Sequence, residues 1–195
     1  SLGDIKDWQA EWKWDGIRSQ LIKRDQSIFL WSRGEELINE SFPDLLTAAG
    51  QLPEGCVLDG ELLCFDAHGP LAFSALQQRL GRKKPTKKLI EQLPAGLLLY
   101  DLLEWEGRDL RSQPLAARRK LLQKLCSHLN PAHFRLSAAL EAETWAELTA
   151  LREGSREHMA EGLMLKRLSS TYESGRKKGD WWKWKVDPLS IDAVL

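Results

Sequence analysis

The stretch Glu11-Trp12-Lys13-Trp14-Asp15-Gly16 decides how the rest of this chain is interpreted. Its short, strand-like pattern places the three charged side chains on one face of a strand and the two tryptophans on the other, because strand side chains alternate. The tryptophan face is expected to pack in a core, which leaves the charged face for chemistry. A lysine amine becomes a nucleophile when desolvation or neighbouring cations remove its proton. We therefore expect further cations close to Lys13.

The composition is that of a globular protein of modest size. With 195 residues, of which 43 % are hydrophobic, the chain can build one sizeable core, and we expect a single domain, 1–195, with two lobes. The 28 basic and 28 acidic side chains cancel. Because no overall positive field exists to hold a polyanion, any contact with nucleic acid must come from local patches.

The cysteines and the apolar segments exclude several classes of protein. Three cysteines, with no Cys-x-x-Cys pair and no histidine at metal-ligand spacing, argue against a disulfide framework or a zinc site and favour a reduced, cytoplasmic setting. No apolar run approaches the roughly 20 residues that a membrane span requires, so no membrane partner is expected. Residues 1–10 contain no apolar signal core.

The hydrophobic pattern predicts an α+β or mixed α/β fold of antiparallel sheets flanked by helices. A hairpin is expected around Asp25-Gln26, and the apolar run 96–103 is expected to lie inside a sheet with both faces covered. The helix predicted for 110–129 has Pro114 in its first turns and a buried stripe of leucines at 115, 122 and 125. Strands are expected at 17–23, 28–31, 56–65, 96–103, 134–136, 162–168 and 181–186, and helices at 43–50, 71–80, 110–129 and 142–152.

One segment is strongly basic. Residues 79–88 contain six cations and no acid and are interrupted by Pro85, which predicts an exposed basic loop that enters a helix. A solvated surface and a patch that contacts phosphate are equally compatible with this pattern. The six cations are Arg79, Arg82, Lys83, Lys84, Lys87 and Lys88.

Trp182-Lys183-Trp184-Lys185 repeats the alternation of the opening stretch. It places Lys183 and Lys185 on one strand face, with Trp182 and Trp184 anchoring the other. Two ammonium groups on one face suit an α-phosphate and would also depress the pKa of a nearby lysine. The alternative is an edge strand with solvated lysines.

Two carboxylate pairs complete the polar candidates. In Asp59-Gly60-Glu61 the two acids point the same way, as a ribose hydroxyl or a divalent metal would require, while a mid-strand glycine marks either close approach of another group or a bulge. Glu161-Gly162, before the apolar strand that ends in Lys166, offers another carboxylate and cation, or is a helix-to-strand turn.

Two single residues are ambiguous when taken alone. Tyr100 in the apolar strand is either a core residue with a satisfied hydroxyl or a ring that stacks on a base. Arg33 in Ser32-Arg33-Gly34 either binds a phosphate through two hydrogen bonds or faces solvent.

Taken in order, these segments resemble the nucleotidyltransferase motifs of ATP-dependent DNA ligases, and the surrounding sequence looks most like the bacterial branch. The resemblance runs from Lys13 to Lys185, nearly the whole chain, and implies an ATP-grasp-like nucleotidyltransferase (adenylation) domain. The segments are Glu11 to Arg18, Ser32-Arg33-Gly34, Asp59-Gly60-Glu61, Tyr100-Asp101, Glu161 to Lys166 and 181–185.

The resemblance implies a three-step reaction. Lys13 attacks the α-phosphate of ATP to form lysyl-AMP, AMP passes to the 5′-phosphate of nicked double-stranded DNA, and the 3′-hydroxyl displaces it. Mg²⁺ and the cations neutralise phosphate charge. The implied roles are adenine recognition by Glu11, cofactor binding by Trp12, ribose or phosphate contacts from Arg18 and Arg33, ribose or metal binding by Glu61, base stacking by Tyr100, metal binding by Glu161, and phosphate binding by Lys166, Lys183 and Lys185.

The departures from the family pattern qualify what this chain is expected to do. The family commonly has Phe where Tyr100 stands, which preserves stacking. Only twelve residues precede Lys13 and ten follow Lys185, so an N-terminal DNA-binding domain and the C-terminal oligonucleotide-binding (OB-fold) barrel, normally in cis, are expected to be absent. We expect a monomeric catalytic core that binds nucleotide, adenylates slowly and seals nicks poorly. The alternatives are an RNA ligase, an mRNA-capping guanylyltransferase, or a nucleotide-binding or DNA-docking module without chemistry.

Overall fold

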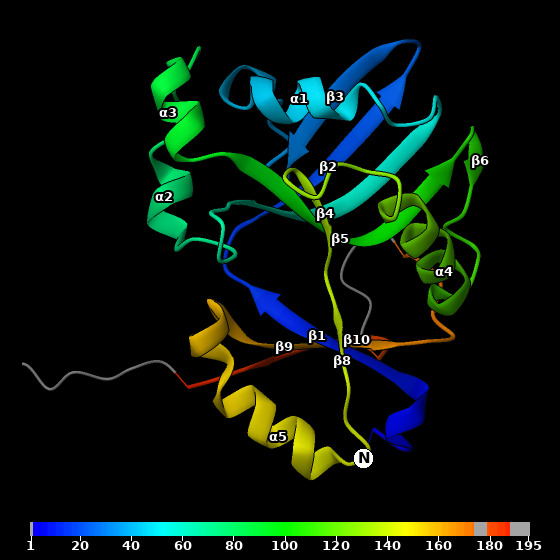
Figure 1. Cartoon of the computed structure of the whole chain (residues 1–195). Helices are drawn as coiled ribbons and strands as arrows, with labels where there is room; N and C mark the ends of the chain where they lie inside the picture. Colours follow the sequence, from blue (N-terminus) through cyan, green and yellow to red (C-terminus); the bar gives the residue numbers. More distant parts are fainter. Residues whose placement is uncertain (1, 174–178, 188–195) are drawn as a thin grey trace, which may run out of the picture.

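The computed structural model describes residues 2–173 and 179–187, which form two β-sheets with helices packed outside them (Figure 1). The smaller sheet has the order β10-β9-β1-β8, and every pairing in it is antiparallel. Its strands are β1 (Trp8–Trp14), β8 (Ala139–Leu140), β9 (Ala160–Arg167) and β10 (Trp181–Lys185).

The larger sheet has the order β3-β2-β4-β5-β6, with β7 also paired to β5. The predicted hairpin is confirmed: Asp25 and Gln26 both have positive φ, 51° and 61°, which gives the turn the twist that a two-residue hairpin requires. The β5–β7 pair is parallel and departs from the antiparallel prediction. The strands are β2 (Ile17–Arg24), β3 (Ser27–Ser32), β4 (Cys56–Cys64), β5 (Ala95–Trp105), β6 (Arg108–Asp109) and β7 (Phe134–Leu136).

The helices divide between the two sheets. Helices α1 to α4 pack around the larger sheet, and α5 packs on the smaller one through β9 (Figure 1). The α-helices are α1 (Pro43–Ala49), α2 (Phe73–Gln77), α3 (Lys87–Gln92), α4 (Leu115–Cys126) and α5 (Trp145–Glu153), and the 3-10 turns are Ile5–Asp7, Asn39–Ser41 and Ser155–His158. No helix among the described residues is long and apolar enough to cross a membrane.

Two helices are shorter than the sequence predicts. The one expected over 71–80 is helical only from Phe73 to Gln77. The one expected over 110–129 begins at Leu115, since residues 108–109 pair with β5 and the backbone amide of Leu110 donates to Leu103. Its predicted stripe is confirmed, because Leu115, Leu122 and Leu125 are buried.

Arg79 does not belong to the exposed basic loop, so that part of the prediction is wrong. Its side chain is fully buried, and its guanidinium donates to Asp44 at 2.6 and 2.8 Å and to the backbone oxygens of Ser41 and Leu93 at 2.8 and 3.0 Å. A buried cation with these acceptors ties α2 to α1 and to the start of β5. The other five cations of the segment are exposed, as predicted.

The core lies in two main parts, one under each sheet. The larger sheet buries apolar side chains such as Leu21, Leu58 and Leu99, and the smaller sheet buries Trp12 and Leu163 among others. The prediction that Trp182 anchors the far face of its strand is wrong, because 43 % of this residue is exposed. The cysteines are free, as predicted.

Gly60 lies where β4 and β5 approach most closely. A Cβ atom at this position would lie 2.9 Å from the backbone oxygen of Leu98, and the pairing of the two strands shifts register between Asp59 and Gly60. Both sequence explanations of this glycine, close backbone approach and a bulge, are therefore correct. The glycine sets the positions of Asp59 and Glu61 on either side of it.

We expect Gly60→Ala to lower the free energy of unfolding by roughly 1–3 kcal/mol, because the methyl group would push β4 away from β5. Urea denaturation measures the change. Gly34→Ala is the matched control, since the nearest atom to its Cβ would be the Ser32 hydroxyl at 3.8 Å. Equal effects of the two substitutions would contradict this explanation of Gly60.

Candidate active site

Lys13 and Lys185 converge on Glu161. Strand β9, which carries Glu161 near its start, lies between β1 and β10, so its side chains can meet those of both neighbours. The ammonium of Lys13 donates to Glu161 Oε2, and the ammonium of Lys185 lies 3.1 Å from the same oxygen. Burial raises the pKa of Glu161, but the two lysines outweigh it and hold this pKa below its usual value. Glu161 is therefore a carboxylate that gathers two cations.

Gly162 allows this convergence. Its φ is +136°, and a Cβ atom there would lie 2.2 Å from the backbone oxygen of Trp184. Any other residue would force β10 away from β9. Gly162 thus lets β10 pack closely against β9, and Glu161 next to it supplies the carboxylate.

Glu61 faces the same lysine from the larger sheet. Burial is the main cause that raises its pKa, to about 7; Asp59 raises it further, whereas Lys13 and Arg18 lower it. Glu61 pairs with Arg18 across β2 and β4, and a Cβ atom at Gly16 would lie 2.9 Å from its Cγ, so Glu61 lies beside the end of the opening stretch. The structure thus joins Lys13, Glu161 and Lys185 and places Glu61 next to the segment that carries Lys13.

Lys183 adds to the positive charge. Partial burial lowers its pKa, and so does the repulsion from Arg33, Lys13, Arg18 and Lys185, in that order. Lys183 is therefore within electrostatic reach of four other predicted site cations. Of these cations, Lys185 shares Glu161 with Lys13, and the phosphate-binding roles of all of them stay predictions.

Arg18 is held in place by a buried carboxylate. Its guanidinium donates to Asp59 Oδ2 at 2.6 Å and to Oδ1 at 3.3 Å, and Asp59 is fully buried. The hydroxyl of Tyr100 donates to Asp59 at 3.1 Å. Tyr100 is thus a buried tyrosine with a satisfied hydroxyl, and its ring lies next to the residues that surround Lys13.

Tyr172 is a member of this network that the sequence did not identify. Its hydroxyl donates to Asp59 Oδ2 at 2.7 Å and accepts from Arg18 at 2.8 Å and from Gln20 at 3.3 Å. The residue follows β9 in a polar loop, where one tyrosine carries no periodic or spacing information. Only the tertiary structure brings it to Arg18.

Lys166 is buried, and its ammonium already has partners. It lies 2.8 Å from Glu11 Oε1, and 4.3 and 4.7 Å from the ring centres of Tyr100 and Trp181. The side-chain amide of Gln9 donates to the same Glu11 oxygen at 2.7 Å. The structure therefore joins the predicted base-reading Glu11 to the predicted phosphate-binding Lys166, so a phosphate would have to replace Glu11 as the lysine's partner.

The side chain of Trp12 lies on the other face of β1. Its ring stacks on His158, with the ring centres 4.4 Å apart and an angle of 20° between the planes, and only 9 % of the residue is exposed. Strand alternation explains this position, because Lys13 takes the opposite face. The side chain of Trp12 is therefore not part of the charged cluster, and its contact with the cofactor stays a prediction.

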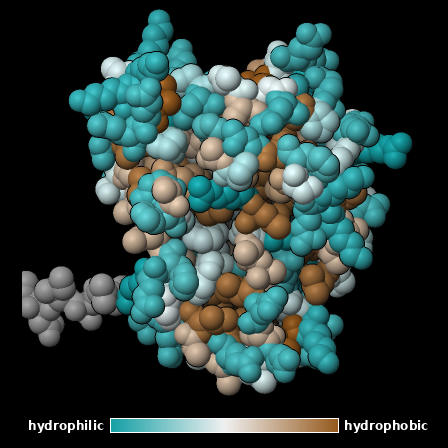
Figure 2. All heavy atoms as spheres, viewed as in Figure 1, coloured by the Kyte–Doolittle hydropathy of each residue, from teal (hydrophilic) through white to brown (hydrophobic). Residues whose placement is uncertain are grey.

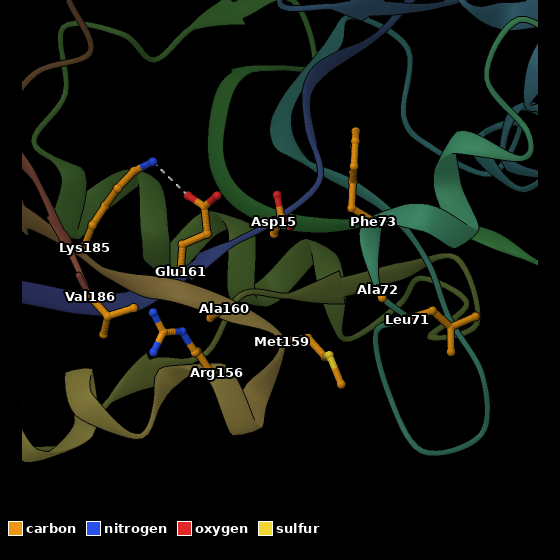
Figure 3. A pocket seen from close by; sticks show the side chains of 10 residues that line it. All are labelled: Asp15, Leu71, Ala72, Phe73, Arg156, Met159, Ala160, Glu161, Lys185 and Val186. Atoms are coloured by element: carbon orange, nitrogen blue, oxygen red, sulfur yellow. Dashed lines mark ion pairs between the residues drawn. The ribbon is translucent and has the colours of Figure 1, made fainter. Parts of the chain in front are cut away.

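A cavity of about 400 Å³ opens beside Glu161 and Lys185 (Figure 3). Asp15 lines it from the end of the opening stretch, and Phe73 lines it from the start of α2. No cluster of three or more His, Cys, Asp or Glu side chains suited to a metal occurs in residues 2–173 and 179–187. The sequence motif contains Asp15 without indicating a role for it, and its place at this cavity makes it a second carboxylate beside Glu161.

Comparison with known proteins identifies the family. Residues 4–185 match the family described as "ATP dependent DNA ligase domain". The chain belongs to this family. The resemblance seen in the sequence is thereby confirmed.

The curated relatives of this DNA ligase domain are longer proteins. A "Probable DNA ligase" of Opitutus terrae is 35 % identical over 96 % of this chain, which spans 21 % of that relative. "DNA ligase 2" of Methanosarcina acetivorans is 31 % identical over the whole chain, which spans 35 % of it. The chain thus spans about a fifth to a third of the length of these two relatives.

Solved ligase structures share the fold. A mycobacterial DNA ligase D complexed with ATP and MES superposes with a TM-score of 0.72 at 28 % identity, over 91 % of this chain and 54 % of that one. The Chlorella virus DNA ligase-adenylate, at 18 % identity and a TM-score of 0.64, supports the fold alone; the match covers 95 % of this chain and 66 % of that one. The predicted α+β nucleotidyltransferase fold is therefore confirmed.

The hydroxyl of Tyr172 is expected to matter only through Arg18. Tyr172→Phe keeps the ring beside Trp181 but removes the hydrogen bonds to Asp59 and Arg18, so we expect formation of the lysine adduct from ATP to slow about three- to tenfold. In an Arg18→Lys background the same substitution should have little effect, because the guanidinium that it positions is gone. Intact-mass time courses measure both rates. An equal slowing in the two backgrounds would show that Tyr172 acts elsewhere.

Glu61 should make stability depend on pH. Its pKa of about 7 in the folded protein exceeds the ordinary 4.5, so the folded state binds a proton more tightly than the unfolded state and loses stability as pH rises between these values. Glu61→Gln cannot ionise. Its free energy of unfolding relative to wild type should therefore increase by roughly 1–3 kcal/mol from about pH 5 to about pH 8. Urea denaturation without nucleotide measures this, and a pH-independent difference would contradict it.

Proposed function

We propose that this chain is the catalytic core of an ATP-dependent DNA ligase and that Lys13 is its nucleophile. The observation that carries the proposal is the meeting of Lys13 and Lys185 at Glu161, beside an open cavity. Lys183, Arg33 and Arg18 add positive charge on the same side. This arrangement fits a reaction in which a lysine attacks a nucleotide phosphate.

In the first step, a bond forms between Lys13 Nζ and the α-phosphorus of ATP, and the bond from that phosphorus to the pyrophosphate oxygen breaks. The ammonium must lose a proton before its nitrogen can attack. Glu161 pairs with this ammonium, so the ion pair has to separate as the reaction proceeds. Lys183 and Lys185 would neutralise phosphate charge while pyrophosphate leaves.

The carboxylates fit a divalent cation held jointly with the nucleotide. Mg²⁺ is usually bound by one or two carboxylates together with water and substrate phosphates, so a cluster of three protein ligands is not required. Glu161 beside the cavity, with Glu61 near Lys13, supplies such carboxylates, and Asp15 lines the same cavity. When bound, Mg²⁺ would neutralise phosphate charge. It would also compete with Lys13 and Lys185 for Glu161.

We assign the nucleotide base to the region of Tyr100 and Glu11. Glu11 is buried, and Lys166 and Gln9 both donate to its Oε1, which fixes the carboxylate beside the Tyr100 ring. A carboxylate accepts hydrogen bonds from an adenine amino group and repels the carbonyl oxygen that guanine carries at the same position. This supports ATP over GTP as the substrate.

Nick sealing is part of the proposal at the level of the whole protein. The relatives named DNA ligase are roughly three to five times as long as the matched part, so we assign transfer of AMP to the 5′-phosphate of nicked DNA, and sealing, to this core acting with further domains in cis, including an OB-fold barrel. We propose that the core itself is one domain of two lobes and a monomer that works in the cytoplasm.

The competing functions differ in nucleotide and in chemistry. An mRNA-capping guanylyltransferase would use the same lysine with GTP, an RNA ligase would pass AMP to RNA, and a docking module would bind nucleotide and form no adduct. The matched relatives named DNA ligase favour the DNA ligase.

Intact-mass measurement with ATP and Mg²⁺ tests the nucleophile. Wild type should gain the mass of one AMP in an acid-labile linkage, whereas Lys13→Ala and Lys13→Arg should gain none. Lys13→Arg is the control for charge, because arginine keeps the ion pair with Glu161 but stays protonated.

The same measurement is repeated with GTP. A gain of one GMP from GTP, with no gain from ATP, would reject the ligase in favour of the capping enzyme. An adduct that persists in Lys13→Arg would move the nucleophile to another residue. Nucleotide binding without any adduct in wild type would favour the docking module.

A further inference from the structure

The exposed cations that follow α2 are not used by the proposed reaction. They are Arg82, Lys83, Lys84, Lys87 and Lys88, and we call them the basic surface. No acidic residue occurs in the chain between Asp66 and Glu91. Glu91 reaches only Lys87, at 3.9 Å, and the other four cations form no ion pair with any residue that the structure describes. The positive charge of this surface is therefore almost uncompensated.

The rest of the chain makes this surface distinctive. Outside residues 81–88 the chain carries 23 basic and 28 acidic side chains, a balance of −5, against +5 within that segment. A polyanion approaching the protein would therefore be attracted locally, since the remainder of the molecule offers it no net attraction. The net charge of zero is therefore the sum of a positive segment and a negative remainder of the chain.

The basic surface is held in a fixed place. At one end the fully buried Arg79 binds Asp44 and the backbone of Ser41 and Leu93. In its middle the backbone amide of Lys84 donates to the oxygen of Glu40 at 3.4 Å, and the Thr86 hydroxyl accepts from the amide of Leu89 and caps α3. Because these bonds already order the segment, binding a ligand there would cost little further ordering of the backbone.

The basic surface is reached directly from the cavity. Phe73, the first residue of α2, lines the cavity that Glu161 and Lys185 also line, and α2 leads from this rim to the basic surface (Figures 1 and 3). Figure 2 shows hydrophilic side chains gathered at the upper left, where Figure 1 places α3. A DNA duplex continues on both sides of a nick, so its backbone extends beyond the cavity rim.

We propose that the basic surface binds the phosphate backbone of duplex DNA away from the nick, without reading its sequence. Lysine and arginine side chains neutralise phosphates and release counterions, which gives affinity that falls steeply with salt. The surface contributes to holding the duplex and takes no part in adenylation. This inference rests on the proposed function, since it takes the polyanion to be the DNA that the ligase seals.

The test compares two pairs of lysines by DNA binding over a range of salt concentrations. Lys87→Gln with Lys88→Gln removes two charges from the basic surface, and Lys120→Gln with Lys124→Gln removes two exposed charges from α4. The probe is a duplex with one 5′-phosphorylated nick, alongside the same duplex without a nick. Fluorescence anisotropy gives the affinities without ATP.

We expect Lys87→Gln with Lys88→Gln, the α3 pair, to weaken binding to both duplexes. The slope of log affinity against log salt should become shallower by roughly 0.9 for each phosphate that the protein no longer neutralises. Adding Lys83→Gln and Lys84→Gln should increase both effects, and the α4 pair should change neither. Lysyl-AMP formation should equal wild type in every variant, so a failure of adenylation tests the proposed function separately from this inference.

Three outcomes would overturn the inference. Equal weakening by the α3 and α4 pairs would show an effect of net charge alone. Unchanged duplex binding in the variant with all four lysines (83, 84, 87 and 88) replaced by glutamine would show that the basic surface does not contact DNA. Loss of binding to polyglutamate with unchanged duplex binding would assign the surface to an acidic protein partner.

Discussion

The rest of the site depends on one carboxylate that two lysines share. Glu161 lies near the start of β9. Lys13 reaches it from β1 on one side, and Lys185 reaches it from β10 on the other. Like charges repel, so Glu161 makes the approach of the two lysines favourable. The same attraction keeps the Lys13 ammonium in an ion pair with Glu161. In the proposed reaction, Lys13 would be released as the nucleophile only when another group takes its place at Glu161.

Polar groups also connect the two sheets. Arg18 and Asp59 belong to the larger sheet, while Tyr172 comes from the loop after β9 and closes a hydrogen-bonded triangle with them. The ammonium of Lys166 from β9 lies over the ring of Tyr100 from β5. Asp59, Tyr100 and Lys166 are buried and Tyr172 is partly buried, and a buried polar group without a partner is strongly disfavoured. The contacts therefore fix how the charged faces of the two sheets oppose each other.

Much of the fold and several site residues could be predicted because their patterns are local. The hairpin at Asp25-Gln26, the apolar strand β5 and the alternation that places Lys13 opposite Trp12 all follow from side-chain periodicity and turn chemistry. The predictions for Arg79 and Trp182 are wrong, since whether an arginine is buried or a tryptophan exposed depends on partners distant in sequence, here Asp44 for Arg79. Tyr172 could not be found at all, because nothing in its neighbourhood distinguishes it from a loop tyrosine.

The sequence by itself indicated the kind of chemistry. The residue types and their order point to a lysine, carboxylates and cations suited to phosphate transfer, and strand alternation puts Lys13 on the face opposite Trp12. Only the tertiary structure decided which charges are partners: that Glu161 holds Lys13 and Lys185, that Glu11 holds Lys166, and that Tyr172 and Asp59 hold Arg18. The physical reason is that strand alternation is a property of neighbouring residues, whereas an ion pair requires two groups to meet across strands, which only the packing of the whole chain specifies.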